Sequence, residues 1–239
     1  MQKKQAKRTL AFISDESIYG HVKKVFGLVK LTLLKEEKRV YKNSVDPFSA
    51  LFDAFWQGIS LNAWMKQERS RQNQKTLQNA LGDFHQEIIG AFDGWKSLGK
   101  GRIFDVKNEK MKIIAEVKNK YNTTKGNHEV AIYDDLRACL KKPAYRGFTA
   151  YYVEIIPQNK KVYNKPFTPS DNRTHKNRPK NNNIRVIDGK SFYGLTTGDN
   201  DALEKFYKVL PKVLTDVLGK SQTKIVKDKS FIDLFKRIY

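Results

Sequence analysis

RIFDVKNEKMKIIAEVK, residues 102–118, is the stretch of sequence that decides the fold. It contains two runs suited to β-strands, residues 102–107 and 113–118, with a polar segment between them. Two strands that follow each other this closely pair most simply as an antiparallel hairpin, and a four-residue loop at residues 109–112 is a common hairpin length. The stretch therefore predicts a β-hairpin.

This hairpin would bring three charged side chains together. In the four-residue register Asp105 lies opposite Glu116, with Cβ atoms about 5 Å apart on one face of the sheet. Lys118 comes two residues after Glu116 and projects from the same face. Two carboxylates at that distance repel each other, and a hard divalent cation such as Mg²⁺ would relieve the repulsion. We therefore expect a cation site with an ammonium group beside it.

The same residues allow other interpretations. A two-residue loop would shift the register and separate the two carboxylates by about 13 Å, at ~3.3 Å per residue. The pattern acid-x-Lys also recurs at residues 36–38, 105–107 and 188–190, so a surface strand with alternating charges would explain it as well. The copy at Glu116 differs because it ends an apolar strand and precedes a polar turn suited to phosphate contact.

Upstream, the spacing of apolar residues predicts two helices. Asp46 can cap the first, and Pro47 suits its first position. The apolar residues of this helix recur at three- and four-residue steps, which is typical of a core-facing stripe: they are Phe48, Leu51, Phe52, Phe55, Trp56 and Ile59. The second helix is expected over residues 76–92. Glu87 lies at the edge of its apolar stripe, where a solvated carboxylate is the alternative to a functional one.

Downstream, helical and strand patterns alternate. The expected elements are a helix at 127–142, a strand at 147–156, a long polar loop at 157–183, short strands at 184–187 and 191–193, a helix at 201–218 that Pro211 kinks or splits, and a short helix at 230–239. This order predicts an α/β fold with a mixed central β-sheet flanked by helices. We interpret residues 1–239 as one domain with a helical N-terminal part, about 1–75.

The composition points to a polyanionic partner. The chain has 46 Lys and Arg residues against 25 Asp and Glu residues, a formal net charge of +21. Such a field most often serves nucleic-acid binding, although a solubility surface or a ribosome-associated protein would also carry it. The lone cysteine, Cys139, excludes a disulfide framework and a thiolate zinc cluster. No apolar run approaches a membrane span and no signal-peptide core is recognised, so we expect a cytoplasmic protein.

Asp105 and the sequence Glu116-Val117-Lys118, on consecutive strands, resemble the PD-(D/E)XK nuclease superfamily, and more closely its small type II restriction endonucleases. Phe104 stands where the motif of this superfamily has proline. Three further stretches are similar to those of small type II enzymes: residues 82–90, 116–126 and 192–198. Together these similarities span about residues 77–210.

The resemblance implies a restriction-endonuclease-like fold and hydrolysis of DNA phosphodiesters with Mg²⁺. Asp105 and Glu116 would ligate the metal, with the Val117 carbonyl as a further ligand, and Lys118 would orient or deprotonate the attacking water. Glu87 would match the helix carboxylate that supports the metal in several such enzymes. The family usually acts as a homodimer on palindromic double-stranded DNA, and a cognate DNA methyltransferase is the expected functional partner.

Two segments are candidates for DNA contact. The turn after Lys118 and the second half of the basic loop offer donors suited to phosphates and base edges: Asn119, Lys120, Asn122, Thr123 and Lys125, then Arg173, Lys176, Arg178, Asn181, Asn182, Asn183 and Arg185. Two interpretations of the loop at 157–183 and the residues after it remain open. Its side chains contact base edges in the major groove, or they contact phosphates alone. A repair or recombination nuclease and a non-catalytic nucleic-acid-binding protein remain the alternative functions.

Overall fold

The computed structural model describes residues 8–33, 45–99, 101–124, 126–219 and 230–239. The chain divides into two compact units. The larger unit comprises Met1–Val22 and His85–Tyr239, and the smaller unit comprises Lys23–Phe84. Helix α1 (Asp15–Leu33) begins in the larger unit and ends in the smaller one, and helix α4 (Leu61–Gly90) begins in the smaller unit and ends in the larger one.

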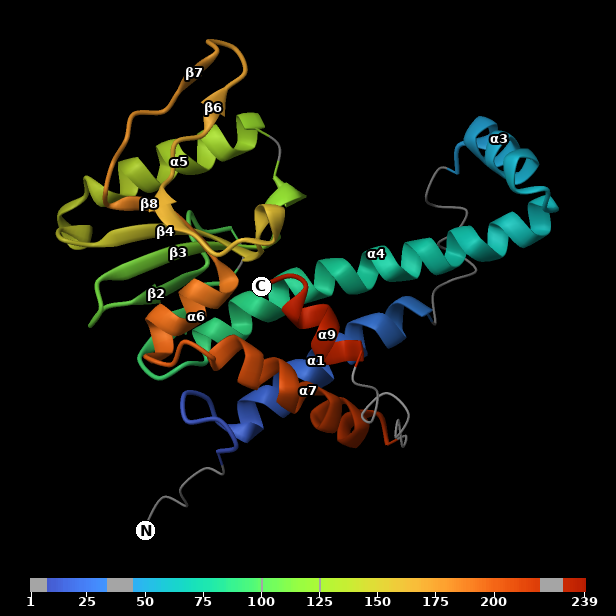
Figure 1. The fold of residues 1–239 in the computed structure, drawn as a ribbon, viewed down its shortest axis with the longest axis horizontal. Helices are drawn as coiled ribbons and strands as arrows, with labels where there is room; N and C mark the ends of the chain where they lie inside the picture. The colour runs from blue at the N-terminus through green and yellow to red at the C-terminus, as the bar shows by residue number, and fades with distance from the viewer. Residues whose placement is uncertain (1–7, 34–44, 100, 125, 220–229) are drawn as a thin grey trace. The chain divides into compact units, whose positions relative to one another are not determined.

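A mixed six-stranded sheet forms the centre of the larger unit in the part of the chain that the structure describes (Figure 1). Its strands, in spatial order, are β1 (Trp95–Ser97), β2 (Val106–Asn108), β3 (Ile113–Lys120), β4 (Thr149–Ile156), β8 (Ile184–Asp188) and β5 (Asn164–Pro166). Strands β1, β2 and β3 are antiparallel, β3, β4 and β8 are parallel, and β5 is antiparallel to β8. The predicted fold class is confirmed.

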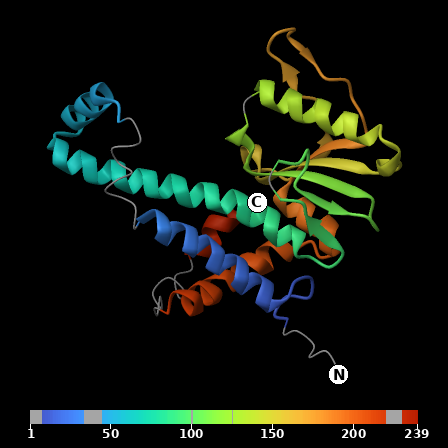
Figure 2. The same ribbon diagram turned by 180° about the vertical axis from the view of Figure 1, so that it is seen from behind.

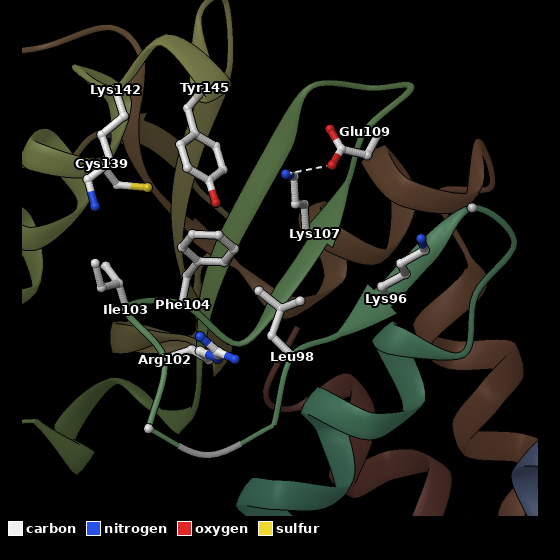
Figure 3. Close-up of a pocket in the computed structure, with 12 residues that line it drawn as sticks. Lys96, Leu98, Arg102, Ile103, Phe104, Lys107, Glu109, Cys139, Lys142 and Tyr145 are labelled. Atoms are coloured by element: carbon white, nitrogen blue, oxygen red, sulfur yellow. Dashed lines mark ion pairs between the residues drawn. The ribbon is translucent and has the colours of Figure 1, made fainter.

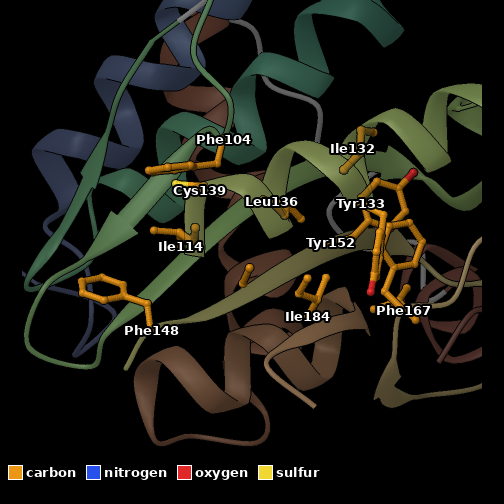
Figure 4. Packing of buried hydrophobic residues seen from close by; sticks show 12 residues of the cluster. Phe104, Ile114, Ile132, Tyr133, Leu136, Cys139, Phe148, Tyr152, Phe167 and Ile184 are labelled. Atoms are coloured by element: carbon orange, nitrogen blue, oxygen red, sulfur yellow. The ribbon is translucent and has the colours of Figure 1, made fainter. Parts of the chain in front are cut away.

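Helices cover both faces of this sheet, as the view from behind shows (Figure 2). Helix α5 (Gly126–Leu140) packs Tyr133 and Leu136 against β3, β4 and β8, with Phe104 in the same buried cluster (Figure 4). On the opposite face, Phe192 of helix α6 (Gly189–Thr197) contacts the Tyr151 ring. Alternate residues of each strand therefore enter one core or the other.

The hairpin has the register expected from the sequence. Val106 pairs with Ala115 and Asn108 pairs with Ile113, which leaves the four-residue loop 109–112. The Asn108 side chain accepts a hydrogen bond from Met111 N at 2.9 Å and closes the loop. The predicted first strand begins too early, because residues 102–105 are irregular and β2 starts at Val106.

Three other expectations in the larger unit need correction. The predicted strand at 191–193 is wrong, because Asp188 accepts a hydrogen bond from Ser191 N at 2.9 Å and starts α6 as its N-cap. Helix α7 (Ala202–Leu218) runs through Pro211 without a break, so the residue does not split it. The long loop is also partly ordered: besides β5 it contains the small hairpin of β6 (Ser170–Asp171) and β7 (Lys176–Asn177). The C-terminal helix is confirmed as α9 (Ser230–Lys236).

Short 3-10 helices join several of these elements. They are η1 (Tyr121–Thr123), which follows β3, η2 (Pro143–Tyr145), which follows α5, and η3 (Gln158–Lys160), which follows β4. In the described residues, no helix is both long enough and apolar enough to cross a membrane.

The smaller unit contains the end of α1, helix α3 (Pro47–Gln57) and the first part of α4, and α3 packs on α4 as a helical hairpin. The cap on α3 is confirmed, since Asp46 accepts a hydrogen bond from Phe48 N at 3.0 Å. The helix expected over residues 76–92 begins earlier than predicted, because α4 runs without a break from Leu61 to Gly90. The helix expected from Asp46 ends at Gln57, where Gly58 caps it in the left-handed conformation, so Ile59 lies outside it.

The predicted core-facing stripe of α3 is wrong. Ala50 and Ala54 are the buried residues of this helix, and they pack against Trp64 of α4. The large apolar residues point outward instead, with Phe48, Phe52, Phe55 and Trp56 between 74% and 90% exposed. The small alanine side chains allow α3 to lie close to α4, and this packing leaves the aromatic residues on the outer side.

Candidate active site

Asp105 lies at the entry to β2, held between two strands. Its backbone N donates to Ala115 O at 2.9 Å, and its carbonyl accepts from Leu98 N at 2.8 Å. The Asp105 carboxylate accepts a hydrogen bond from Val117 N at 2.7 Å. These contacts fix the carboxylate beside the middle of β3.

Glu116 and Lys118 project from β3 on the face that α5 covers, because they alternate with buried Ala115 and Val117. Their side chains form an ion pair and are 13% and 22% exposed. The adjacent strand β4 places Tyr152 beside Glu116 and Glu154 beside Lys118. The structure thus brings the three predicted residues together.

The electrostatics of this cluster are dominated by the repulsion between two carboxyl groups. Burial and the nearby Glu116 carboxylate raise the pKa of Asp105 from 3.8 to about 7, although the Val117 N–H and Lys118 oppose the rise. Two carboxyl groups that disfavour shared ionisation in this way fit a hard divalent cation with oxygen ligands. Among the described residues, however, no group of three or more His, Cys, Asp or Glu side chains is arranged to hold a metal ion.

The helix α4 contributes a residue that the sequence analysis did not single out. Gln86 Nε2 lies 3.3 Å from the Val117 carbonyl and donates a hydrogen bond to it. Glu87, the residue we expected to serve the site, has an oxygen 3.7 Å from His21 Nδ1 of α1. The sequence gives no signal for Gln86 beyond its position next to Glu87, and both residues are partly buried in the structure.

The polar turn after β3 folds as η1. Thr123 Oγ1 accepts a hydrogen bond from Lys120 N at 3.1 Å and also bonds to Lys120 O. Asn122 is exposed next to them, and Asn119 is partly buried at the end of β3. Lys125 lies outside the described residues.

The basic loop divides into two kinds of residue. Arg178 is bound to two acids, with its guanidinium 2.7 Å from Asp134 of α5 and 3.2 Å from Asp171 of β6. Arg185 Nε donates to the Asn164 side chain at 2.6 Å. The other candidate residues of this loop make no such ion pair within the described residues. Asn181 accepts a hydrogen bond from the Asn183 backbone N–H in a turn. The exposed candidate residues are Arg173, Lys176, Asn182 and Asn183.

A pocket of about 550 Å³ opens beside β2, next to the loop that leads into Asp105 (Figure 3). Four cationic side chains line it: Lys96, Arg102, Lys107 and Lys142. Lys107 is held in place by an ion pair with Glu109, and its ammonium lies 4.6 Å from the centre of the Tyr145 ring. No sequence pattern indicates this pocket, because its residues come from β1, β2, the loop between them, the end of α5 and the segment that follows α5.

Comparison with known proteins places the sequence of this chain in a family. The family model that matches residues 10–219 is described as Eco47II restriction endonuclease. The type II restriction enzyme Eco47II of Escherichia coli is 41% identical over 237 residues, which cover 96% of this chain and 98% of that protein. The type II restriction enzyme Sau96I of Staphylococcus aureus is 29% identical over 234 residues, which cover 96% of this chain and 88% of that enzyme.

Proposed function

Since this chain belongs to the Eco47II restriction endonuclease family, and is therefore a sequence-specific endonuclease, we propose that Asp105, Glu116 and Lys118 form its catalytic centre. The substrate is double-stranded DNA, as for restriction enzymes in general. The observation that carries the proposal is the juxtaposition of the Asp105 carboxylate, with its raised pKa, and the Glu116–Lys118 ion pair.

Asp105 and Glu116 are the proposed ligands of Mg²⁺, together with the carbonyl oxygen of Val117. Their fit to the ion is supported by the repulsion between the two carboxyl groups, which a cation would offset. When bound, Mg²⁺ would polarise a phosphoryl oxygen and lower the pKa of a water molecule. The Val117 N–H holds one oxygen of Asp105, which leaves the other oxygen of this carboxylate for the ion.

Lys118 supplies a positive charge beside the carboxylates of Asp105 and Glu116. Its ammonium group has three donors, and the ion pair with Glu116 keeps it within reach of a phosphate at the same site. We propose that Lys118 orients the attacking water as an ammonium donor, or accepts the proton of that water once it has given up its own proton and is a neutral amine. Glu87 is retained as a supporting carboxylate from α4, while Gln86 holds the Val117 carbonyl in position.

Contacts with DNA are proposed at the turn after β3 and at the exposed part of the basic loop. Asn119, Lys120, Asn122 and Thr123 directly follow the catalytic strand, so the DNA backbone would meet them next to the reacting phosphate. Because Arg178 and Arg185 are bound within the protein, we propose that they shape the loop and that its exposed residues contact DNA. A homodimer and a cognate methyltransferase complete the proposal.

Incubation of the purified protein with plasmid DNA and Mg²⁺ tests the function. Discrete, reproducible fragments are expected. The substitutions Glu116→Gln and Lys118→Ala should lower the cleavage rate at least about 10²-fold and preserve DNA binding. Two matched controls at exposed positions of α5 and α7, Asp135→Asn and Lys212→Ala, should cleave at the wild-type rate.

Three outcomes would contradict this proposal. Nicking that follows DNA structure instead of sequence would favour a repair nuclease. A gel shift without cutting under any metal condition would favour a binding protein. Cleavage that survives Glu116→Gln at the full rate would mean that another carboxylate pair is catalytic.

A further inference from the structure

Helix α3 presents a large apolar surface, which we call the α3 face. It consists of Phe48, Leu51, Phe52, Phe55 and Trp56, which are 74%, 45%, 75%, 81% and 90% exposed. Folded proteins rarely expose this many neighbouring aromatic side chains, and such patches mark interaction sites. The function described above gives no role to these residues.

The orientation of α3 is fixed by contacts on its other side. Ala50 and Ala54 are buried against Trp64, and the Trp64 indole N–H donates to the Asp53 carboxylate at 2.8 Å. Asp53 also accepts from Gln57 at 2.9 Å. Rotating the helix to bury its aromatic residues would break these contacts. The contacts that fold the α3–α4 hairpin therefore keep the α3 face exposed.

The charge around the α3 face argues against DNA as its partner. Residues 45–65 contain no Lys or Arg, whereas 46 of the 239 residues of the chain are basic. DNA binding relies on lysine and arginine to neutralise phosphates. Two copies of a chain with a net charge of +21 repel each other over most of their surfaces. At residues 45–65 two copies can approach without repulsion between Lys or Arg side chains.

The area of the α3 face matches the needs of a dimer. Taking about 150–250 Å² for each large side chain, the exposed fractions of the four aromatic residues and Leu51 correspond to about 550–900 Å². A stable interface of standard size buries about 800 Å² on each partner. A two-fold dimer uses the same patch on both copies, so one α3 face per protomer suffices.

We propose that the α3 face is the self-association surface of this enzyme, with the α3 face of a second copy as its occupant. Two α3–α4 hairpins would then pack as four helices around a shared apolar core. The choice of a second copy rests partly on the proposed function, because a site that is cut on both strands calls for two catalytic centres. The partner copy would cover the aromatic residues that the single chain leaves exposed.

Sedimentation equilibrium on the full chain tests this proposal. The wild type, at 27.7 kDa per chain, should sediment as a dimer. The double substitution Phe52→Ser with Trp56→Ser should raise the dissociation constant at least about 100-fold, because both side chains are anchors of the interface. Leu234→Ser, at an exposed leucine of α9, is the matched control and should remain dimeric.

A second variant covers the case in which the double substitution fails to fold. Phe52→Cys should give a disulfide-linked dimer on mild oxidation, since Phe52 is the central residue of the α3 face and would meet its own copy at a two-fold axis through that face, and the native Cys139 is buried. A monomeric wild type would overturn the proposal, and so would a wild-type dimer that persists in the double variant and forms no disulfide in Phe52→Cys. Binding of a monomeric wild type to neutral lipid vesicles, lost in the double variant, would also overturn it and assign the α3 face to a membrane surface.

The same samples separate this proposal from the proposed function. A wild type that dimerises through the α3 face but does not cut DNA would contradict the catalytic proposal alone. A wild type that cuts DNA into discrete fragments as a monomer would contradict the dimer proposal alone. Glu116→Gln should leave the dimer intact, because it lies in the other unit of the chain.

Discussion

Replacing Asp105 with asparagine should stabilise the metal-free protein while abolishing cleavage. Burial and Glu116 raise the pKa of Asp105 from 3.8 to about 7, a rise of about three pKa units, each of which corresponds to about 1.4 kcal/mol. The upper bound on the cost of keeping this carboxylate ionised is thus about 4 kcal/mol. An asparagine oxygen can still accept from Val117 N, but burying its amide NH₂ costs about 1–3 kcal/mol. We expect a net gain of about 2 kcal/mol.

The gain should depend on pH with a definite sign. Because the folded state raises the pKa of Asp105, the unfolded chain loses this proton first as the pH rises. The wild type therefore loses stability between about pH 4 and pH 7, and Asp105→Asn removes that loss. At pH 4 the variant should be less stable than the wild type by about 1–3 kcal/mol, because only the cost of the buried amide NH₂ remains. Above pH 7 the variant should be more stable by about 2 kcal/mol, which corresponds to a rise in Tm of about 4–8 °C.

Urea unfolding at pH 5 and pH 8, in EDTA and in Mg²⁺, measures these effects. Mg²⁺ at about ten times its dissociation constant should stabilise the wild type by about 1.4 kcal/mol and leave Asp105→Asn unchanged. The control Asp135→Asn, at an exposed acid of α5, should change the unfolding free energy by less than about 0.5 kcal/mol. A variant less stable than the wild type at every pH, or one stabilised equally by Mg²⁺, would refute the reasoning.

The remaining predictions concern stability and DNA affinity. Gly189→Ala should lower the unfolding free energy by about 1–3 kcal/mol in urea, because a Cβ there would lie 2.5 Å from Ile155 O; an unchanged midpoint would contradict this close approach. Burial raises the pKa of Glu154, and the hydrogen bond from the Tyr163 hydroxyl opposes that rise. Tyr163→Phe should therefore destabilise the protein by about 1–3 kcal/mol, and by more at pH 8 than at pH 5. Equal losses at the two pH values would contradict a role of this hydrogen bond in stabilising the ionised Glu154. If the pocket beside β2 holds a DNA phosphate, Arg102→Ala should reduce the slope of log affinity against log salt by about 0.9 in fluorescence anisotropy with EDTA, and an unchanged slope would exclude that contact.

The hairpin shows what local sequence can determine. The alternation of apolar residues and the loop length predicted the pairing of β2 and β3, and with it the approach of Asp105 to Glu116. Both signals lie within seventeen residues, so little chain entropy separates the pattern from the structure. The predicted strand at 191–193 is wrong although the deciding signal is again local. The Asp188 carboxylate caps a helix, but the aromatic residues that follow Asp188 favour a strand.

Contacts between distant segments were beyond the sequence patterns. Gln86 reaches Val117 across 31 positions, and Arg178 binds Asp134 across 44. A glutamine on a helix and an arginine in a basic loop carry no sequence feature that distinguishes them from others. Their partners are defined only when the fold brings Gln86 to Val117 and Arg178 to Asp134. The pocket beside β2 has the same origin, because strands and loops from separate parts of the chain form its walls.

The error in α3 has a different cause, and it bears on how apolar stripes are interpreted. Three- and four-residue spacing shows that one side of a helix avoids water, but it does not say whether the covering surface comes from the same chain. In α3 the spacing is correct, and the protein buries the alanine side against Trp64 instead. A helix with two apolar sides, one small and one aromatic, can pack twice. The small side fits the neighbouring helix of its own chain, and the aromatic side has the area that a second chain requires.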